Sequence, residues 1–175
     1  RAQPDASFSL LVDNTQVLLR ELEAGRLDFV LVEGFFDHSR YEAQLCRREE
    51  FFGVCAPHHR LAGRAVPLDE LAGERLILRE SGSGTRAIFE EALHRENWTL
   101  HSFPNVVTIS DFSTIKSLTA DGLGVSFLYA PVVAQELKDG TLARFDLAEV
   151  PMSGAFYFVC LKDNLFAKAW LDWMQ

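Results

Sequence analysis

The sequence has little of three features that would point to other classes of protein: cysteine, positive charge and long apolar runs. Its 175 residues include 17 Lys and Arg against 25 Asp and Glu, which gives a formal net charge of −8. That balance argues against a chain that wraps a phosphate backbone by itself. The longest apolar runs have the length of strands and are too short to cross a bilayer. Residues 1–5 contain no apolar stretch of a signal peptide.

The three cysteines, Cys46, Cys55 and Cys160, are odd in number and widely spaced. Their mostly apolar neighbours favour reduced, buried thiols of a cytoplasmic protein over a disulfide framework. A nucleophilic thiol would need a nearby base, and His58 and His59 follow Cys55 closely. They come after a proline in an expected turn, so a Cys–His pair is the weaker interpretation.

Signatures of enzymes and metal sites are also absent. The run from Gly82 to Arg86 lacks the lysine of a phosphate-binding P-loop. His58 and His59 are adjacent, so they cannot share one face of a helix or strand as metal ligands. No Gly-x-Ser-x-Gly nucleophile elbow has a sensible context. We therefore expect no enzyme, no metal and no cofactor.

What the chain does contain is an alternation of strand and helix patterns, with 48% hydrophobic and 24% charged residues, as in α/β globular proteins. Apolar runs predict strands at 7–12, 27–32, 51–55, 75–79, 106–109, 125–129, 142–147 (a short edge strand) and 156–161. Capping and periodicity predict helices at about 15–24, 67–71, 85–97, 111–121 and 131–139, and a last helix with Phe166, Trp170 and Trp173 on one core-facing side. The first strand, helix and strand predict a parallel βαβ unit.

The stretch from Glu80 to Arg86 joins an apolar strand to a helix through a Gly/Ser turn. The glycines let the backbone come close to a guest, and the first N–H groups of the helix attract an anion. Ser83 or Thr85 could equally be a plain helix cap. Three other strand-to-helix turns carry polar or small residues: Asp13-Asn14-Thr15, Glu33-Gly34 and Ser110-Asp111. Such turns gather at the carboxyl ends of strands, which predicts a binder of a small, anionic molecule.

The order of these segments resembles the effector-binding domain of LysR-type transcriptional regulators over essentially the whole chain. Five stretches carry the resemblance: Leu22–Gly34, Ala56–Gly63, Leu68–Gly73, Leu76–Arg86, and Ile115-Lys116 through Gly122–Val125.

The resemblance implies a periplasmic-binding-protein type II fold, in which two α/β lobes are joined by two crossover strands. The first lobe would comprise residues 1–50 plus 155–175, the second 57–151, and the crossover strands 51–55 and 156–161. The resemblance also implies ligand contacts from Asn14, Thr15, Glu33, Gly34, Ser81, Gly82, Ser83, Ser110, Asp111, Phe127 and Tyr129. An ionised Glu33 would repel an anion, and Arg79 would offset it only if its side chain points inward.

The chain departs from the family pattern in two ways. It has nothing that resembles the N-terminal winged helix-turn-helix, so we expect DNA binding only through a domain absent from this chain. We also expect the first strand and helix of the first lobe to be missing, because residues 1–5 resemble the end of that helix. We expect a fragment whose first lobe has an exposed strand edge.

By the resemblance, the whole protein is a cytoplasmic, homodimeric regulator that senses a small metabolite between its lobes and has no membrane partner. The alternative is a solute-binding protein of a transporter, which shares the fold.

Overall fold

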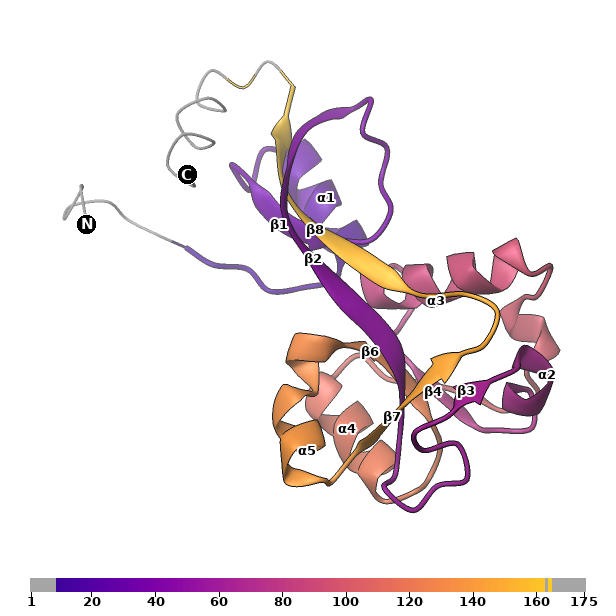
Figure 1. The fold of residues 1–175 in the computed structure, drawn as a ribbon. Coiled ribbons are helices and arrows are strands. Elements are labelled where there is room, and N and C mark those ends of the chain that lie inside the picture. The colour runs from indigo at the N-terminus through magenta and orange to yellow at the C-terminus, as the bar shows by residue number, and fades with distance from the viewer. Residues whose placement is uncertain (1–8, 163, 165–175) are drawn as a thin grey trace.

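The computed structural model describes residues 9–162 and 164 of the chain. It is a mixed α/β structure in which two groups of elements are joined by long strands (Figure 1). We call residues 9–50 and 153–162 the first lobe, and residues 51–152 the second lobe. The predicted α/β class and two-lobed arrangement are confirmed, whereas the predicted residue limits of the lobes and crossovers stay predictions.

Two antiparallel strands form the spine of the molecule, β2 (Tyr41–Cys55) and β8 (Ser153–Leu161). The outer half of β2 pairs with β8 from Tyr41 opposite Leu161 to Glu50 opposite Ser153. Its inner half, from Phe51 onward, lies between β6 and β7 of the second lobe. β2 begins ten residues before the predicted strand. The prediction missed this extension because residues 44–50 are largely charged and exposed, and such a stretch lacks the apolar pattern of a strand.

The first lobe contains α1 (Thr15–Glu23) and β1 (Val30–Glu33) on the β2–β8 pair. Asn14 caps α1 by accepting a 3.0 Å hydrogen bond from the Val17 N–H, and Gly25 follows the helix at φ +67°. The predicted parallel βαβ unit is wrong for the described residues. β1 pairs antiparallel with β8, and residues 9–14 form no strand. Periodicity gives strand type but not the partner of a strand.

The second lobe holds the remaining elements. In chain order they are β3 (Ala65–Val66), α2 (Leu68–Leu71), β4 (Leu76–Leu78), α3 (Gly84–Arg95), η1 (Leu100–Ser102), β5 (Val106–Thr108), α4 (Phe112–Ala120), β6 (Ser126–Tyr129), η2 (Ala130–Val132), α5 (Ala134–Asp139) and β7 (Ala143–Leu147). The main sheet has the order β1-β8-β2-β7-β3, with β6 also on β2, while β4 and β5 form a parallel pair. β7 is therefore internal, between β2 and β3, and the prediction of an edge strand is wrong.

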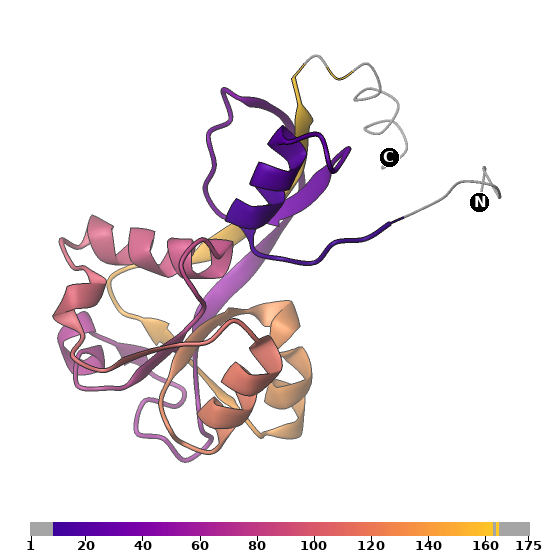
Figure 2. The same ribbon diagram turned by 180° about the vertical axis from the view of Figure 1, so that it is seen from behind.

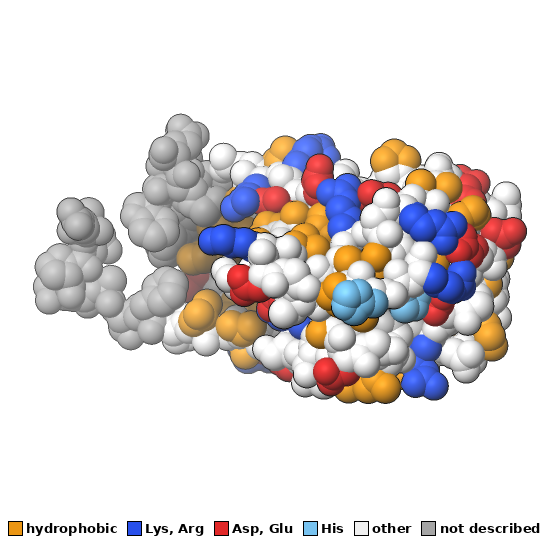
Figure 3. Space-filling view, turned by 60° about the horizontal axis from the view of Figure 1, so that its bottom comes forward, with side chains coloured by type: hydrophobic (Ala, Val, Ile, Leu, Met, Phe, Trp, Pro, Cys, Tyr) orange, Lys and Arg blue, Asp and Glu red, His pale blue; other side chains and the backbone are white. Residues whose placement is uncertain are grey.

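Aromatic side chains dominate the core of the second lobe. Phe127 stacks on Phe89 with ring centroids 4.1 Å apart and meets Phe145 edge-on at 5.5 Å. Gly53 of β2 makes room for this cluster, because a Cβ there would lie 2.3 Å from the Phe145 ring. At the outer end of this lobe, basic and acidic side chains intermingle on the surface (Figure 3).

The cysteines are only partly as predicted. All three are free thiols, and Cys55 and Cys160 are buried, but Cys46 is exposed. Cys46 lies where the register of β2 on β8 shifts between Leu45 and Arg47, within a stretch of largely charged and exposed residues. The predicted last helix with Phe166, Trp170 and Trp173 lies outside the described residues.

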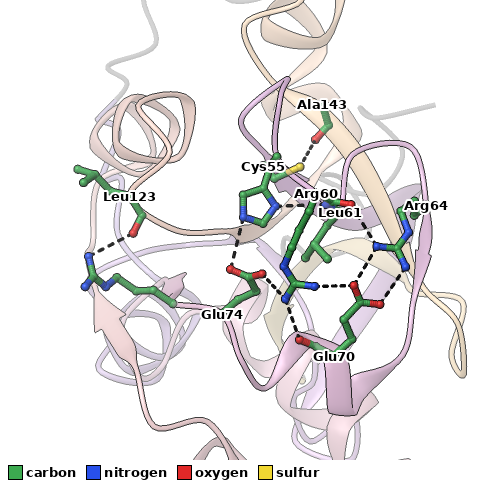
Figure 4. Close-up of polar contacts among 10 residues, drawn as sticks. Cys55, Arg60, Leu61, Arg64, Glu70, Glu74, Leu123 and Ala143 are labelled. Atoms are coloured by element: carbon green, nitrogen blue, oxygen red, sulfur yellow. Dashed lines mark hydrogen bonds and ion pairs between the residues drawn. The ribbon is translucent and has the colours of Figure 1, made fainter.

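Cys55 does not form the Cys–His pair considered from the sequence. Its Sγ lies 3.6 Å from the Ala143 carbonyl oxygen (Figure 4). Burial, together with the nearby Glu74 carboxylate, raises the pKa of Cys55 to about 11, so the thiol stays protonated at neutral pH. His59 instead faces Glu74, with Nε2 3.4 Å from Oε2, while its Nδ1 accepts from the Leu61 N–H at 3.4 Å.

Within the described ranges, no helix is both long and apolar enough to cross a membrane. The same residues contain no cluster of His, Cys, Asp and Glu side chains suited to a metal ion.

Candidate functional site: the cleft between the lobes

Polar turns from both lobes meet at one cavity of about 500 Å³. α1 and β1 contribute to this cavity from the first lobe, whereas the ends of β4 and β5 and the starts of α3 and α4 contribute from the second. Figures 1 and 2 show the two lobes from opposite sides. The lining residues are Val12, Asp13, Asn14, Thr15, Leu18, Leu31, Val32, Glu33, Arg79, Glu80, Ser83, Ser110, Asp111, Phe112 and Phe156. We call this cavity the cleft.

Six of the predicted ligand contacts lie together on the cleft wall: Asn14, Thr15, Glu33, Ser83, Ser110 and Asp111. They come from four turns that are far apart in sequence, and each turn follows a strand or begins a helix. The expectation that such turns gather at strand ends accounts for this convergence. Whether these residues contact a ligand stays a prediction.

Five other predicted contacts lie elsewhere. Gly34 lines a separate cavity of about 350 Å³ and Gly82 one of about 260 Å³, while Ser81 does not line the cleft. Phe127 and Tyr129 are 2% and 1% exposed and belong to the core. In the structure the last two pack in the core, which is consistent with the apolar pattern of β6 in the sequence.

All three of the described helices that begin at the cleft have a side-chain oxygen as an N-terminal cap. Asp111 accepts the Thr114 N–H at 2.6 Å, and Asn14 accepts the Val17 N–H at 3.0 Å. The hydrogen bond from the Thr114 N–H, followed by that from its hydroxyl, holds the pKa of Asp111 below its usual range. At these two helix ends, some of the N–H groups that could bind an anion therefore already have a partner.

The third helix, α3, is capped from the other lobe. Glu33 Oε1, at the end of β1, accepts hydrogen bonds from the Thr85 N–H at 3.1 Å and from the Thr85 hydroxyl at 2.6 Å. The N-cap residue Ser83 makes no capping bond with its own side chain. Burial, with the neighbouring Glu33 carboxylate, raises the pKa of Tyr129. The carboxylate of Glu33 thus occupies the start of α3, where an anion from outside the chain could otherwise bind.

Further backbone and side-chain contacts join the same parts of the two lobes. The Gln16 N–H donates to the Gly82 carbonyl at 3.2 Å, and Asn14 Nδ2 donates to Glu80 Oε1 at 3.2 Å. A Cβ on Gly84 would lie 2.4 Å from the Glu33 carbonyl oxygen. The glycine is therefore required here for close approach of the lobes.

Arg79 lies inward, which the sequence left open. Its side chain is 10% exposed and its guanidinium carbon lies 4.3 Å from the centre of the Phe112 ring. It donates two hydrogen bonds to Glu80, at 2.8 and 3.0 Å. Burial opposes ionisation of Glu80, but the hydrogen bonds to its carboxylate, chiefly from Arg79, outweigh this and lower its pKa. Among the described residues, the one guanidinium that lines the cleft is therefore already paired.

Sequence reasoning did not include Arg79, Phe112 or Phe156 among the contacts. Phe156 lies within a strand whose alternate side chains face the cleft and the 350 Å³ cavity. Strand alternation could have separated its two faces, but nothing in the pattern says which face is turned to the cleft.

The chain matches the family described as LysR substrate binding domain over residues 1–175. It is 31% identical over 141 residues to the Escherichia coli K12 protein named "Uncharacterized HTH-type transcriptional regulator YeiE", covering 81% of this chain and 47% of that protein. It is 27% identical over 168 residues to the transcriptional regulator CbbR of Rhizobium meliloti, covering 95% of this chain and 53% of that protein. The chain thus spans about half the length of these relatives.

Solved structures show the same fold. The regulatory domain of Synechocystis CcmR in complex with 2-PG superposes with a TM-score of 0.78 at 24% identity, covering 95% of this chain and 80% of that one. The effector-binding domain of QuiR in complex with shikimate gives 0.76 at 17% identity, covering 93% and 77%. With the family match over its whole length, the chain belongs to the LysR substrate-binding domain family.

Proposed function

We propose that this chain is the sensor part of a LysR-type transcriptional regulator and that it binds a small-molecule effector in the cleft. The observation that carries the proposal is the cleft itself, since one cavity collects six polar turn residues from both lobes. A ligand held by both lobes changes the free energy of their relative arrangement, and it shifts the population of lobe arrangements by its difference in affinity for them.

The regulator would act in the cytoplasm as a homodimer, with DNA held by a winged helix-turn-helix outside this chain. The family match and the regulators among the relatives support this reading. Effector binding would bias the orientation of the DNA-binding domains by a coupling of about 1–3 kcal/mol. The same relatives are regulators rather than enzymes, and we propose no catalytic role.

The test is a thermal-shift screen of small anions, carboxylates, amines and amino acids. A ligand at about a hundred times its dissociation constant stabilises the folded protein by about 2.7 kcal/mol, which gives a clear rise in Tm. Ser83→Ala and Ser110→Ala should reduce the shift. Ser117→Ala is the matched control, because Ser117 is exposed on α4 and does not line the cleft.

A hit that all three variants keep would place the ligand outside the cleft and contradict the proposal. A screen without any hit, on protein that unfolds cooperatively, would also count against effector binding by this chain.

A further inference from the structure

We propose that Glu33 is an internal competitor of the effector: an anionic group of the ligand displaces its carboxylate from the start of α3. This inference rests on the proposed function and adds which residue sets the charge selectivity of the cleft and links its occupancy to the lobes.

The first step of the argument is the place that Glu33 occupies. The start of a twelve-residue helix offers free N–H donors and the positive end of the helix dipole. The Glu33 carboxylate takes the Thr85 N–H and the Thr85 hydroxyl at this point. An anionic ligand group at the same donors must replace it, because two carboxylates at one site repel each other.

The second step is a polar atom beside this point that still lacks a partner. Ser83, the N-cap of α3, is 2% exposed and lines the cleft, and its Oγ has no hydrogen-bond partner among the described residues. A buried hydroxyl without a partner costs free energy. A ligand group at the start of α3 would give this hydroxyl a partner, which Glu33 does not.

The third step is that Glu33 belongs to the other lobe. It ends β1 in the first lobe, whereas Thr85 lies in the second. Displacing its carboxylate removes two hydrogen bonds between the lobes. Ligand entry and the loosening of this contact are then one event, which links cleft occupancy to lobe arrangement.

The other charges of the cleft do not compete in this way. Arg79 and Glu80 neutralise each other, Asp111 caps its own helix, and Asp13 accepts from the neighbouring Asn14 N–H at 2.8 Å. These carboxylates weaken anion binding only through the general field of the cleft. Asp28 is exposed on the first lobe and does not line the cleft. Asp28→Asn therefore removes the same charge as Glu33→Gln without freeing α3, and it is the matched control.

The experiment measures the dissociation constant of sulfate by calorimetry at fixed pH and ionic strength. Glu33→Gln and Glu33→Ala should bind sulfate about tenfold more tightly than the wild-type chain, within the usual range of couplings. Asp28→Asn should change the dissociation constant by no more than about twofold. The alanine variant keeps the test informative if glutamine retains the bonds to Thr85 or prevents folding.

Equal sulfate affinity in the wild type and both Glu33 variants would overturn the inference, as would an equal gain from Asp28→Asn. Absence of sulfate binding in every variant would overturn it too. An amine from the effector screen that loses affinity in Glu33→Gln would refute competition while leaving the sensor proposal intact. A screen without hits, alongside tighter sulfate binding in the Glu33 variants, would contradict the sensor proposal alone.

Discussion

The two lobes differ in how they are held together. The second lobe has two clusters of buried side chains, and the larger one contains the stacked rings of Phe89 and Phe127. Among the described residues, the first lobe has a single cluster of six: Leu18, Leu22, Val30, Val32, Tyr41 and Val159. Two of these belong to β2 and β8, the strands that run between the lobes. Within the described residues, the second lobe therefore buries more apolar side chains, and the cluster of the first lobe relies in part on strands that it shares with the second.

The surface of the first lobe shows the same difference. Leu10, Val12 and Leu31 are 79%, 82% and 57% exposed. They line a cavity of about 490 Å³ beside β1, which in the described structure pairs on one side only, with β8. Apolar side chains that remain in water contribute nothing to folding, so this part of the lobe adds little to the free energy of unfolding.

The largest effect expected is from removing a ring at the centre of the second lobe. Phe127→Ala leaves a cavity between Phe89 and Phe145 and should lower the free energy of unfolding by about 3–5 kcal/mol, measured by urea denaturation. Leu123→Ala, at a side chain that is 48% exposed, is the control and should cost less than about 0.5 kcal/mol. A loss below about 1.5 kcal/mol for Phe127→Ala would show that this core is not the stronger one.

The equivalent change in the first lobe is Leu22→Ala, on the buried face of α1. Leu22 is 1% exposed, and we expect a loss of about 2–3 kcal/mol. Native-state hydrogen exchange should show the loss in amides of α1 and β1, with those of β4 and β6 protected as before. Equal loss of protection in both lobes would mean that they unfold as one unit.

A third change tests the contact between the lobes. Gly84→Ala places a Cβ against the Glu33 carbonyl oxygen, and we expect a loss of about 1–3 kcal/mol in urea denaturation. Gly73→Ala is the control, because its Cβ would meet no atom closer than 3.5 Å and its φ is not positive. Equal stability of both variants would contradict this prediction, because it would mean that the lobes can separate enough to admit the Cβ without a loss of free energy.

The sequence predicted the second lobe better than the first, and the reason is physical. Strands and helices with one buried face have regularly spaced apolar residues in the sequence. Asp111 and Gly122 mark the two ends of α4, because Asp111 caps its start and Gly122 follows its end at a positive φ. The convergence of the polar turns followed from the α/β order. The partners of the strands could not be predicted in this way, because the apolar pattern of β1 or β7 is the same whichever strand lies beside it. The partner of Glu33 was also out of reach, because its bond to Thr85 spans 52 positions along the chain.

The smallest effect expected concerns Glu80, which binds Arg79 in its own lobe and Asn14 in the other. Its pKa is lowered on folding from its usual value of 4.5. Its ionised form therefore stabilises the folded state above that pH, and the contribution is lost as pH falls through the folded pKa. Relative to Glu80→Gln, the wild type should be more stable by about 1 kcal/mol at pH 7, with the difference shrinking as the pH falls below 4.5.

Urea midpoints from pH 3 to pH 7 measure this difference. The control is Glu91→Gln, because the ion pair of Glu91 with Arg95 is exposed and should contribute less than about 0.5 kcal/mol. A difference for Glu80 that stays constant from pH 7 to pH 3 would mean that its shape, rather than its charge, joins the lobes. A difference that disappears on acidification would make the Arg79–Glu80 pair an electrostatic part of the lobe contact, beside the hydrogen bonds of Glu33.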